Sequence, residues 1–268
     1  MSRPLATVAV TTLLLGVAAC GSGGSGPASS VSASSGATSS GASHGHLTVF
    51  AAASLKATFT KIGARFEKAH PGTTVTFSFA GSSDLVSQLQ QGAPADVFAS
   101  ADVPNMQKAT RESLTSGAPV DFASNTLEIA VPPGNPAHVT SLADLTKPGV
   151  NVVVCAPAVP CGAAAVKVEH AAAIRLTPVS EEQSVTDVLG KVRSGEADAG
   201  LVYVTDVKGA GSAVVGVPFP QSSAAVNAYP IAVLRTSTDA ALAKAFVDAV
   251  TGGPGQGILA AAGFRPAP

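Results

Sequence analysis

The sequence predicts an α/β fold with mostly parallel sheets that are covered by helices on both faces. Short runs of apolar or alternating residues, typical of strands, take turns along the chain with runs whose apolar residues recur at helical spacing. Such alternation is the pattern of sheets that lie between layers of helices. Residues 46–268 are enough for one large domain or for two small lobes with their own cores.

Each element is predicted from its own local pattern. In the first helix, Leu55, Phe59 and Ile62 recur at spacings of four and three, so they lie on one face. Residues 73–79 alternate between polar and β-favouring side chains, as in a strand with one buried face. Strands are expected at 47–51, 73–79, 97–98, 127–131, 150–154, 199–204 and 229–234. Helices are expected from 55 to Gly72, around 85–89, within 103–111, and at 162–173, 184–192, 239–250 and 257–262.

The first residues have the layout of an export signal. Arg3 precedes an uncharged apolar run that is short for a membrane span and ends in small residues. The run ends in Val17-Ala18-Ala19-Cys20, which resembles the lipobox of bacterial lipoproteins. This resemblance implies removal of residues 1–19 and lipidation of Cys20, and an ordinary secretory signal with a chance cysteine is the alternative.

The next segment predicts a tether. Residues 21–45 are nearly all Gly, Ser and Ala, and such a chain cannot bury enough apolar surface to offset its entropy. We therefore expect a domain that is held at the extracytoplasmic face of the cell membrane by Cys20 and this 20–45 segment. With 16 Lys+Arg against 17 Asp+Glu, the chain shows no charge excess that would favour nucleic acid or an anionic surface as a partner.

Two turns share one construction, in which a strand ends in small residues and a serine precedes a helix. They contain Ala52-Ala53-Ser54-Leu55 and Ala80-Gly81-Ser82-Ser83. The serines can serve as plain helix N-caps. However, a helix start also offers unpaired N–H groups and partial positive charge, so two such turns that face each other would bind an anion without a cationic side chain.

Cys155 and Cys161 lie six positions apart across a predicted turn. In an exported protein this spacing favours a disulfide, and two reduced buried cysteines are the alternative. Closing so short a loop would stabilise the fold by about 2 kcal/mol in the chain-entropy model. Two thiols without a well-spaced histidine pair predict no zinc site.

Six sequence blocks are spread along the chain, and the resemblance they carry extends over about residues 47–264. They are Ala52-Ala53-Ser54-Leu55, Phe79-Ala80-Gly81-Ser82-Ser83, the run 92–102 that begins Gly92-Ala93-Pro94-Ala95-Asp96, Val159-Pro160-Cys161-Gly162, Ser184-Val185-Thr186 and the run 200–206. In this order the blocks resemble the molybdate-binding ModA family, and the run from Gly92 is the most specific. The resemblance implies a two-lobed periplasmic-binding-protein-like fold (type II) with its ligand in the interlobe cleft. We expect lobe 1 at 46–126 plus 229–268 and lobe 2 at 127–228, joined by two crossing strands.

The resemblance also implies the ligand set. The family holds molybdate or tungstate through two serine hydroxyls, backbone N–H groups and a tyrosine hydroxyl. Carried over by motif, these contacts fall on Ser54, Ser82, Cys161, Val185 and Tyr203. Ser83 is the alternative to Ser82 because the two serines are adjacent. Cys161 would act through its backbone, where the family usually has a small residue.

The implied function is non-enzymatic capture of molybdate, and also of tungstate, for the permease of an ABC importer by a monomeric lipoprotein. No cofactor is expected, and no residue would bind the molybdenum atom directly. A fully deprotonated oxyanion only accepts hydrogen bonds, and none of the five expected contacts is Asp or Glu. The alternatives are the same fold with sulfate or phosphate, a scaffolding lipoprotein, and a secreted serine hydrolase that uses Ser54 or Ser82, which would need a histidine and an acid beside the serine.

Overall fold

The computed structural model describes residues 45–268. The expected export signal, Cys20 and almost all of the tether lie outside the described residues. Within 45–268, no helix is both long and apolar enough to cross a membrane.

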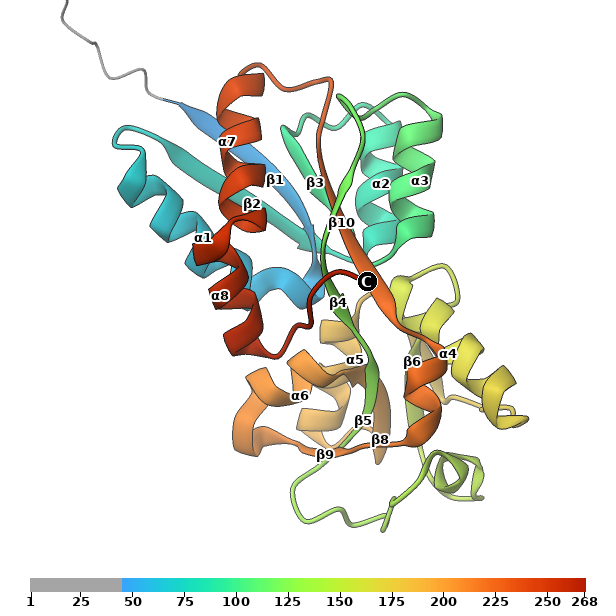
Figure 1. Cartoon of the computed structure of the whole chain (residues 1–268). Helices are drawn as coiled ribbons and strands as arrows, with labels where there is room; N and C mark the ends of the chain where they lie inside the picture. The colour runs from blue at the N-terminus through green and yellow to red at the C-terminus, as the bar shows by residue number, and fades with distance from the viewer. Residues whose placement is uncertain (1–44) are drawn as a thin grey trace, which may run out of the picture. The chain divides into compact units, whose positions relative to one another are not determined.

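Two five-stranded sheets organise the described chain (Figure 1). The first sheet has the order β2-β1-β3-β10-β4 and the second has the order β7-β6-β8-β5-β9. The strands of the first sheet are β1 His46–Ala52, β2 Thr74–Ala80, β3 Val97–Ala99, β4 Val120–Asn125 and β10 Asn227–Val233. Those of the second are β5 Leu127–Val131, β6 Val152–Cys155, β7 Ser180–Glu182, β8 Ala199–Tyr203 and β9 Val215–Val217.

Each sheet carries its own helices, and we call a sheet with its helices the first or the second lobe. The first lobe has α1 Lys56–Ala69, α2 Ser82–Gln90, α3 Val103–Arg111, α7 Ala240–Thr251 and α8 Gly253–Ala262. The second lobe has α4 Pro160–Ala172, α5 Val185–Ser194 and α6 Val204–Ala210. Short 3-10 helices lie at Ala53–Leu55, Leu142–Thr146, Gly211–Ala213 and Pro220–Ala224.

The sheets are mixed, so the expectation of mostly parallel sheets is wrong. β1 runs parallel to β2 and β3, and β6 runs parallel to β7 and β8. In contrast, β10 is antiparallel to β3 and β4, and β5 is antiparallel to β8 and β9. The physical reason is that β4 passes through Thr126 directly into β5 in the other sheet. Parallel neighbours in one sheet need a crossover connection, usually a helix, between them. β4 and β5 follow each other without such a crossover, and both pair with antiparallel neighbours.

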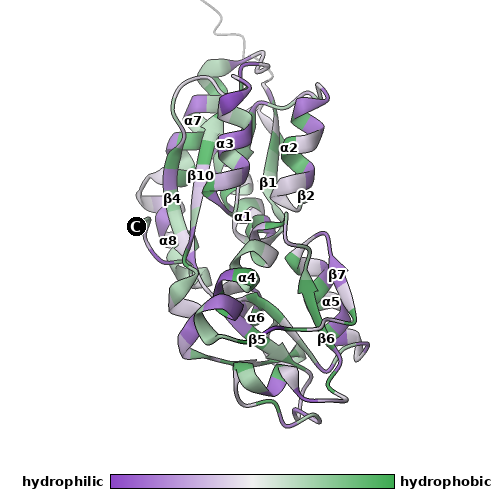
Figure 2. Ribbon diagram, turned by 90° about the vertical axis from the view of Figure 1, so that its right-hand side faces the viewer, coloured by the Kyte–Doolittle hydropathy of each residue, from purple (hydrophilic) through white to green (hydrophobic). Residues whose placement is uncertain are grey.

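Helices cover both faces of the first sheet, as the sequence predicts. On one face, Phe59 packs among aromatic rings, with centroids 5.8 Å from Phe122 and 6.2 Å from Phe246. On the other face, α2 and α3 bury Leu85 and Met106. The second lobe has a separate aliphatic core, and Figure 2 shows hydrophobic residues along β5 and β6 within it. Two separate cores leave the space between the lobes free for a site.

Candidate anion-binding site

A small pocket lies between residues that follow strands of both sheets, where α/β folds usually bind ligands. All five residues of the expected ligand set line it: Ser54, Ser82, Cys161, Val185 and Tyr203. The other lining residues are alanine, glycine, valine and proline, so no charged side chain lines the pocket. A volume of about 10 Å³ is open to the centre of a water molecule, close to what one buried water needs, so the lobes meet closely here.

Helix starts converge on this pocket. Ser82 is the first residue of α2, Val185 is the first residue of α5, and Cys161 is the second residue of α4. Ser54 lies in the 3-10 helix that precedes α1, and Tyr203 directly precedes α6. The N–H groups of a first helical turn have no partner within the helix and carry partial positive charge. The pocket therefore offers hydrogen-bond donors and a favourable potential for an anion without any lysine or arginine.

The two pocket serines are held by different neighbours. The Oγ of Ser82 is fully buried and accepts a hydrogen bond from the Ala101 N–H at 3.0 Å. The Oγ of Ser54 lies 3.1 Å from the Tyr229 hydroxyl. Since Ser82 Oγ accepts from the backbone, its own proton remains available to the pocket.

The structure separates the adjacent serines that the sequence could not distinguish. Ser82 lines the pocket, whereas Ser83 does not. The Oγ of Ser83 is buried and has no hydrogen-bond partner within the described residues. The geometry therefore favours Ser82 over Ser83 as the second hydroxyl of the site.

Tyr203 is 1% exposed, and its hydroxyl accepts a hydrogen bond from Asn227 Nδ2 at 3.1 Å. Its ring meets the ring of Tyr229 edge to face, with centroids 6.1 Å apart. Burial raises the pKa of the Tyr203 phenol well above its ordinary value, and it also raises the pKa of Tyr229. Both hydroxyls are therefore neutral and able to donate.

Three residues behind the pocket were not predicted from the sequence: Asn227, Tyr229 and Asp206. Asp206 Oδ2 accepts a hydrogen bond from the Tyr203 N–H at 3.0 Å, which fixes the start of α6 beside the pocket. Burial raises the pKa of Asp206 to about 7, and the bond from Tyr203 only partly offsets this. The sequence held one hint of Tyr229: the chain has two tyrosines, and both rings meet behind the pocket.

The loop before α4 is closed by a disulfide between Cys155 and Cys161, with an S–S distance of 2.07 Å and Cα atoms 5.6 Å apart. Gly162 follows it, and a Cβ at this position would lie 2.0 Å from the Ala156 carbonyl oxygen. The loop is thus pressed against the first turn of α4, and the bridge holds the turn at which Cys161 lines the pocket.

The lobes touch around the pocket. A Cβ on Gly81 of the first lobe would lie 2.2 Å from the carbonyl oxygen of Gln183 in the second lobe. Asn105 Nδ2, at the start of α3, lies 3.4 Å from the Ala158 carbonyl oxygen in the disulfide loop. The described structure is therefore a closed state, which depends on the absence of a side chain at Gly81.

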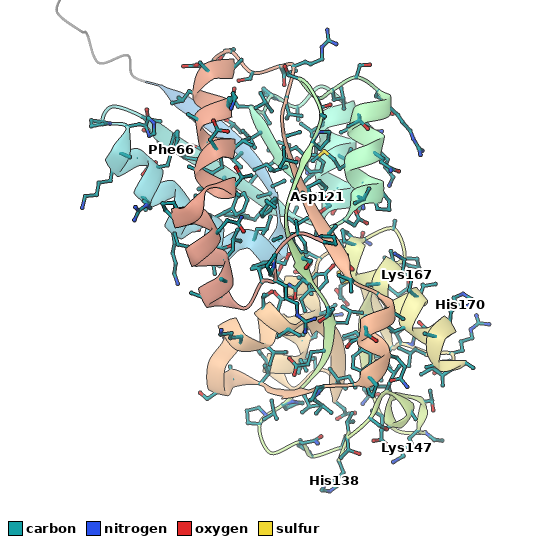
Figure 3. The ribbon with its side chains drawn as sticks, viewed as in Figure 1. Phe66, Asp121, His138, Lys147, Lys167 and His170 are labelled. Carbon is teal, nitrogen blue, oxygen red and sulfur yellow. A yellow bond between two sulfur atoms is a disulfide. The ribbon has the colours of Figure 1, made fainter. Side chains whose placement is uncertain are left out.

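Histidines and metal-ligating groups are not gathered at the pocket. Within residues 45–268, no histidine bonds to Ser54 or Ser82, and no three His, Cys, Asp or Glu side chains form a group that could hold a metal ion. Figure 3 shows His138 and His170 pointing outward from the second lobe. The described residues offer neither pocket serine the histidine that a serine hydrolase requires.

The two lobes and the pocket between them define a binding protein. A family model described as "Bacterial extracellular solute-binding protein" matches residues 47–265, and the chain belongs to this family. The molybdate-binding protein ModA of Mycobacterium tuberculosis is 53% identical over 218 residues, which cover 81% of this chain and 84% of that protein. ModA of Escherichia coli is 31% identical over 233 residues and covers 83% and 90%, respectively.

Solved structures show the same fold. The periplasmic molybdate-binding protein of Azotobacter vinelandii has a TM-score of 0.71 at 23% identity, over 81% of this chain and 98% of that one. The sulfate-binding protein SubI of Mycobacterium tuberculosis has a TM-score of 0.72 at 20% identity, over 83% and 87%. At these identities the likeness concerns the fold alone, and it does not distinguish a molybdate protein from a sulfate protein.

The raised pKa of Asp206 predicts a pH dependence of stability. The folded state keeps the Asp206 proton up to pH about 7, whereas an unfolded chain releases it near pH 4. Between these values the folded state binds more protons, so the free energy of unfolding falls as pH rises. Asp206→Asn keeps an acceptor for the Tyr203 N–H but has no proton to lose. As pH rises from 4 to 8, its free energy of unfolding should therefore increase, relative to that of the unmodified protein, by up to about 4 kcal/mol. Urea unfolding across this range measures the difference, and parallel curves for the two proteins would contradict it.

Proposed function

We propose that the protein captures molybdate, and also tungstate, and delivers it to the permease of an ABC importer. The observation that carries the proposal is the charge-neutral pocket in which three hydroxyls and the starts of α2, α4 and α5 meet. Molybdate at neutral pH is a tetrahedral dianion that can only accept hydrogen bonds, so a site of donors without a carboxylate suits it. The oxygens of the anion, rather than its metal atom, would meet Ser54, Ser82, Cys161, Val185 and Tyr203.

Neutral donors are sufficient for tight binding. A hydrogen bond to a charged group contributes about 1.5–3 kcal/mol, and the proposed set could supply roughly seven. Their sum exceeds the roughly 11 kcal/mol of a ligand with a dissociation constant of about 10 nM, even after the cost of association. A cationic side chain is therefore not needed for affinity.

The relatives favour molybdate over the other oxyanions that the fold accommodates. Both ModA proteins named above bind molybdate by their names, and one of them is 53% identical to this chain. A site for protonated phosphate would need an acceptor, and Asp84, the acidic residue in the first turn of α2, does not line the pocket. Sulfate is the alternative ligand in the same fold.

We infer that residues 46–126 with 229–268 and residues 127–228 act as two rigid lobes, with β4–β5 and β10 as the crossing strands. Ser54 and Ser82 belong to the first range, whereas Cys161, Val185 and Tyr203 belong to the second. Because only the closed state brings all donors to the anion, the ligand stabilises that state.

We also infer that Cys20 carries a lipid and that residues 20–45 tether a monomeric binding domain to the outer face of the membrane. The inference rests on the lipobox-like segment 17–20, which lies outside the described residues. The protein would then act as a carrier and not as an enzyme. Lack of labelling of Ser54 and Ser82 by a fluorophosphonate would argue against the serine hydrolase alternative.

Titration calorimetry with molybdate, tungstate, sulfate and phosphate tests the ligand assignment on the soluble chain from residue 41 onward. We expect molybdate and tungstate to bind at least about 100-fold more tightly than sulfate and phosphate, a difference of about 3 kcal/mol. Equal affinity for sulfate would show that the pocket selects tetrahedral dianions in general and would sink the molybdate assignment.

The adjacent serines give a matched pair of variants. Ser82→Ala should weaken molybdate binding by about 10- to 100-fold, because it removes a hydroxyl donor to a charged ligand. Ser83→Ala also removes a serine hydroxyl, but this one lies one residue further along and does not line the pocket. The affinity for molybdate should therefore remain within about twofold. Calorimetry of both variants decides the assignment, and the reverse outcome would place Ser83 at the ligand.

The lipid anchor is tested with the full-length chain expressed in a bacterium fed an alkyne-labelled fatty acid. We expect label on the mature protein and none on Cys20→Ala, which should appear as unprocessed or soluble protein. The other two cysteines of the chain, Cys155 and Cys161, form the disulfide and have no free thiol, so any label that remains on Cys20→Ala lies on another residue type. Equal labelling of the two proteins would contradict lipidation at Cys20.

A further inference from the structure

Asn227 links the hydroxyl of Tyr203 to Ala101, the residue whose N–H donates to Ser82. It is the first residue of β10, one of the crossing strands, and it is 7% exposed. Its Nδ2 donates to the Ala101 carbonyl oxygen at 2.8 Å and to the Tyr203 hydroxyl at 3.1 Å, and the Pro160 carbonyl oxygen lies at 3.4 Å. Ala101 belongs to the first lobe, and the other two belong to the second.

The chemistry of these partners fixes which way the amide faces. A carbonyl oxygen can only accept, so the nitrogen of the Asn227 amide, and not its oxygen, must lie toward Ala101 and Pro160. The Tyr203 hydroxyl lies beside the same nitrogen and therefore accepts as well. Its single proton is left for another acceptor. The neighbouring Tyr229 hydroxyl is one such acceptor, and an oxygen of a ligand in the pocket that Tyr203 lines would be the other.

The same neighbour sets the direction of the Ser82 hydroxyl. The Ala101 N–H donates to Ser82 Oγ at 3.0 Å, while the Ala101 carbonyl oxygen accepts from Asn227. The Ser82 hydroxyl thus accepts from the Ala101 N–H, and the Tyr203 hydroxyl accepts from the Asn227 NH₂ group. Neither nitrogen can accept, so each hydroxyl must act as the acceptor in these bonds. By the ranges given above, Asn227 and Tyr203 both belong to the second lobe, so the bond between them does not require closure, whereas the bond from Asn227 to Ala101 joins the lobes.

We propose that Asn227 is a positioning residue that makes the Tyr203 hydroxyl a proton donor to the bound oxyanion. The proposal rests on the proposed function and adds a basis for selectivity. A hydroxyl that already accepts one hydrogen bond directs its proton to a fully deprotonated oxygen and is a poorer acceptor for a P–OH group. Asn227 therefore favours dianions without a proton, such as molybdate, over hydrogen phosphate.

The first test reads the hydroxyl without any ligand. Tyrosine labelled with ¹³C at the ring carbon that bears the oxygen gives two signals, since the chain has two tyrosines, and Tyr203→Phe assigns them. Asn227→Ala should move the Tyr203 signal. The control is Asn125→Ala on the neighbouring crossing strand, whose buried amide donates to Thr205 Oγ1 at 2.8 Å and also bonds to the Tyr229 hydroxyl. It should move the Tyr229 signal more than the Tyr203 signal, whereas Asn227→Ala should do the reverse. An unmoved Tyr203 signal in Asn227→Ala would overturn the proposal.

The second test is a double-variant cycle on molybdate affinity. Asn227→Ala and Tyr203→Phe should each weaken binding about 10-fold or more, and the double variant should match Tyr203→Phe within about twofold. Asn227→Asp, which keeps the size but replaces donors with acceptors, should weaken binding at least as much as Asn227→Ala. The preference for molybdate over phosphate should fall in Asn227→Ala, because the freed phenol oxygen can then accept.

The outcomes separate this proposal from the function on which it rests. Multiplying effects in the cycle, or an unchanged preference between molybdate and phosphate, would overturn the role of Asn227 while molybdate binding by the unmodified protein stands. If the unmodified protein binds another oxyanion instead, the molybdate assignment fails and the same cycle with that anion decides the role of Asn227. Failure to bind any of the four oxyanions would overturn both.

Discussion

Unpaired N–H groups at helix starts are the constraint on which this structure depends. A buried backbone N–H without a partner is costly, and the first turns of α2, α4 and α5 bring several of them to one small pocket. The proposed anion between the lobes would satisfy these donors and meet the positive ends of the helices. The pocket can therefore remain free of charged side chains, and its selectivity must come from the direction and number of its donors.

Close backbone approach follows from this constraint. Helix starts can surround one small ion only where the preceding turns lack bulky side chains, and Gly81 and Gly162 each leave no room for a Cβ. Gly81 faces a carbonyl oxygen of the other lobe, so the absence of a side chain at Gly81 allows the two lobes to come together. Gly162 faces the disulfide loop, so the absence of a side chain at Gly162 allows this loop to pack against the first turn of α4. The alanine-rich turns that first suggested an anion site therefore have a packing reason as well.

Local sequence patterns predicted the helices and strands whose apolar residues show a clear periodicity. They failed for segments that are strands only because they form hydrogen bonds with a neighbouring strand. α3 occupies the predicted interval 103–111, and β5 has the predicted bounds 127–131. In contrast, β7 is Ser-Glu-Glu and is a strand because it pairs with β6. The crossing strand β4 ends in Ala-Ser-Asn, and its partners are β10 and the backbone of Arg265 near the end of the chain. Such contacts depend on tertiary structure and leave no periodic trace in the sequence.

The same limit applies to the site. Motifs in short segments located Ser54, Ser82, Cys161, Val185 and Tyr203, and the structure brings all of them to one pocket. The residues that contact the hydroxyls of Ser54 and Tyr203, namely Tyr229 and Asn227, come from the distant strand β10, and Tyr229 is 175 positions away from Ser54. A cationic pocket would attract any anion, whereas hydroxyls with fixed polarity distinguish oxyanions by whether they carry a proton. In the proposed mechanism the donors are divided between two lobes, so opening would remove part of the set at once and make tight capture compatible with release.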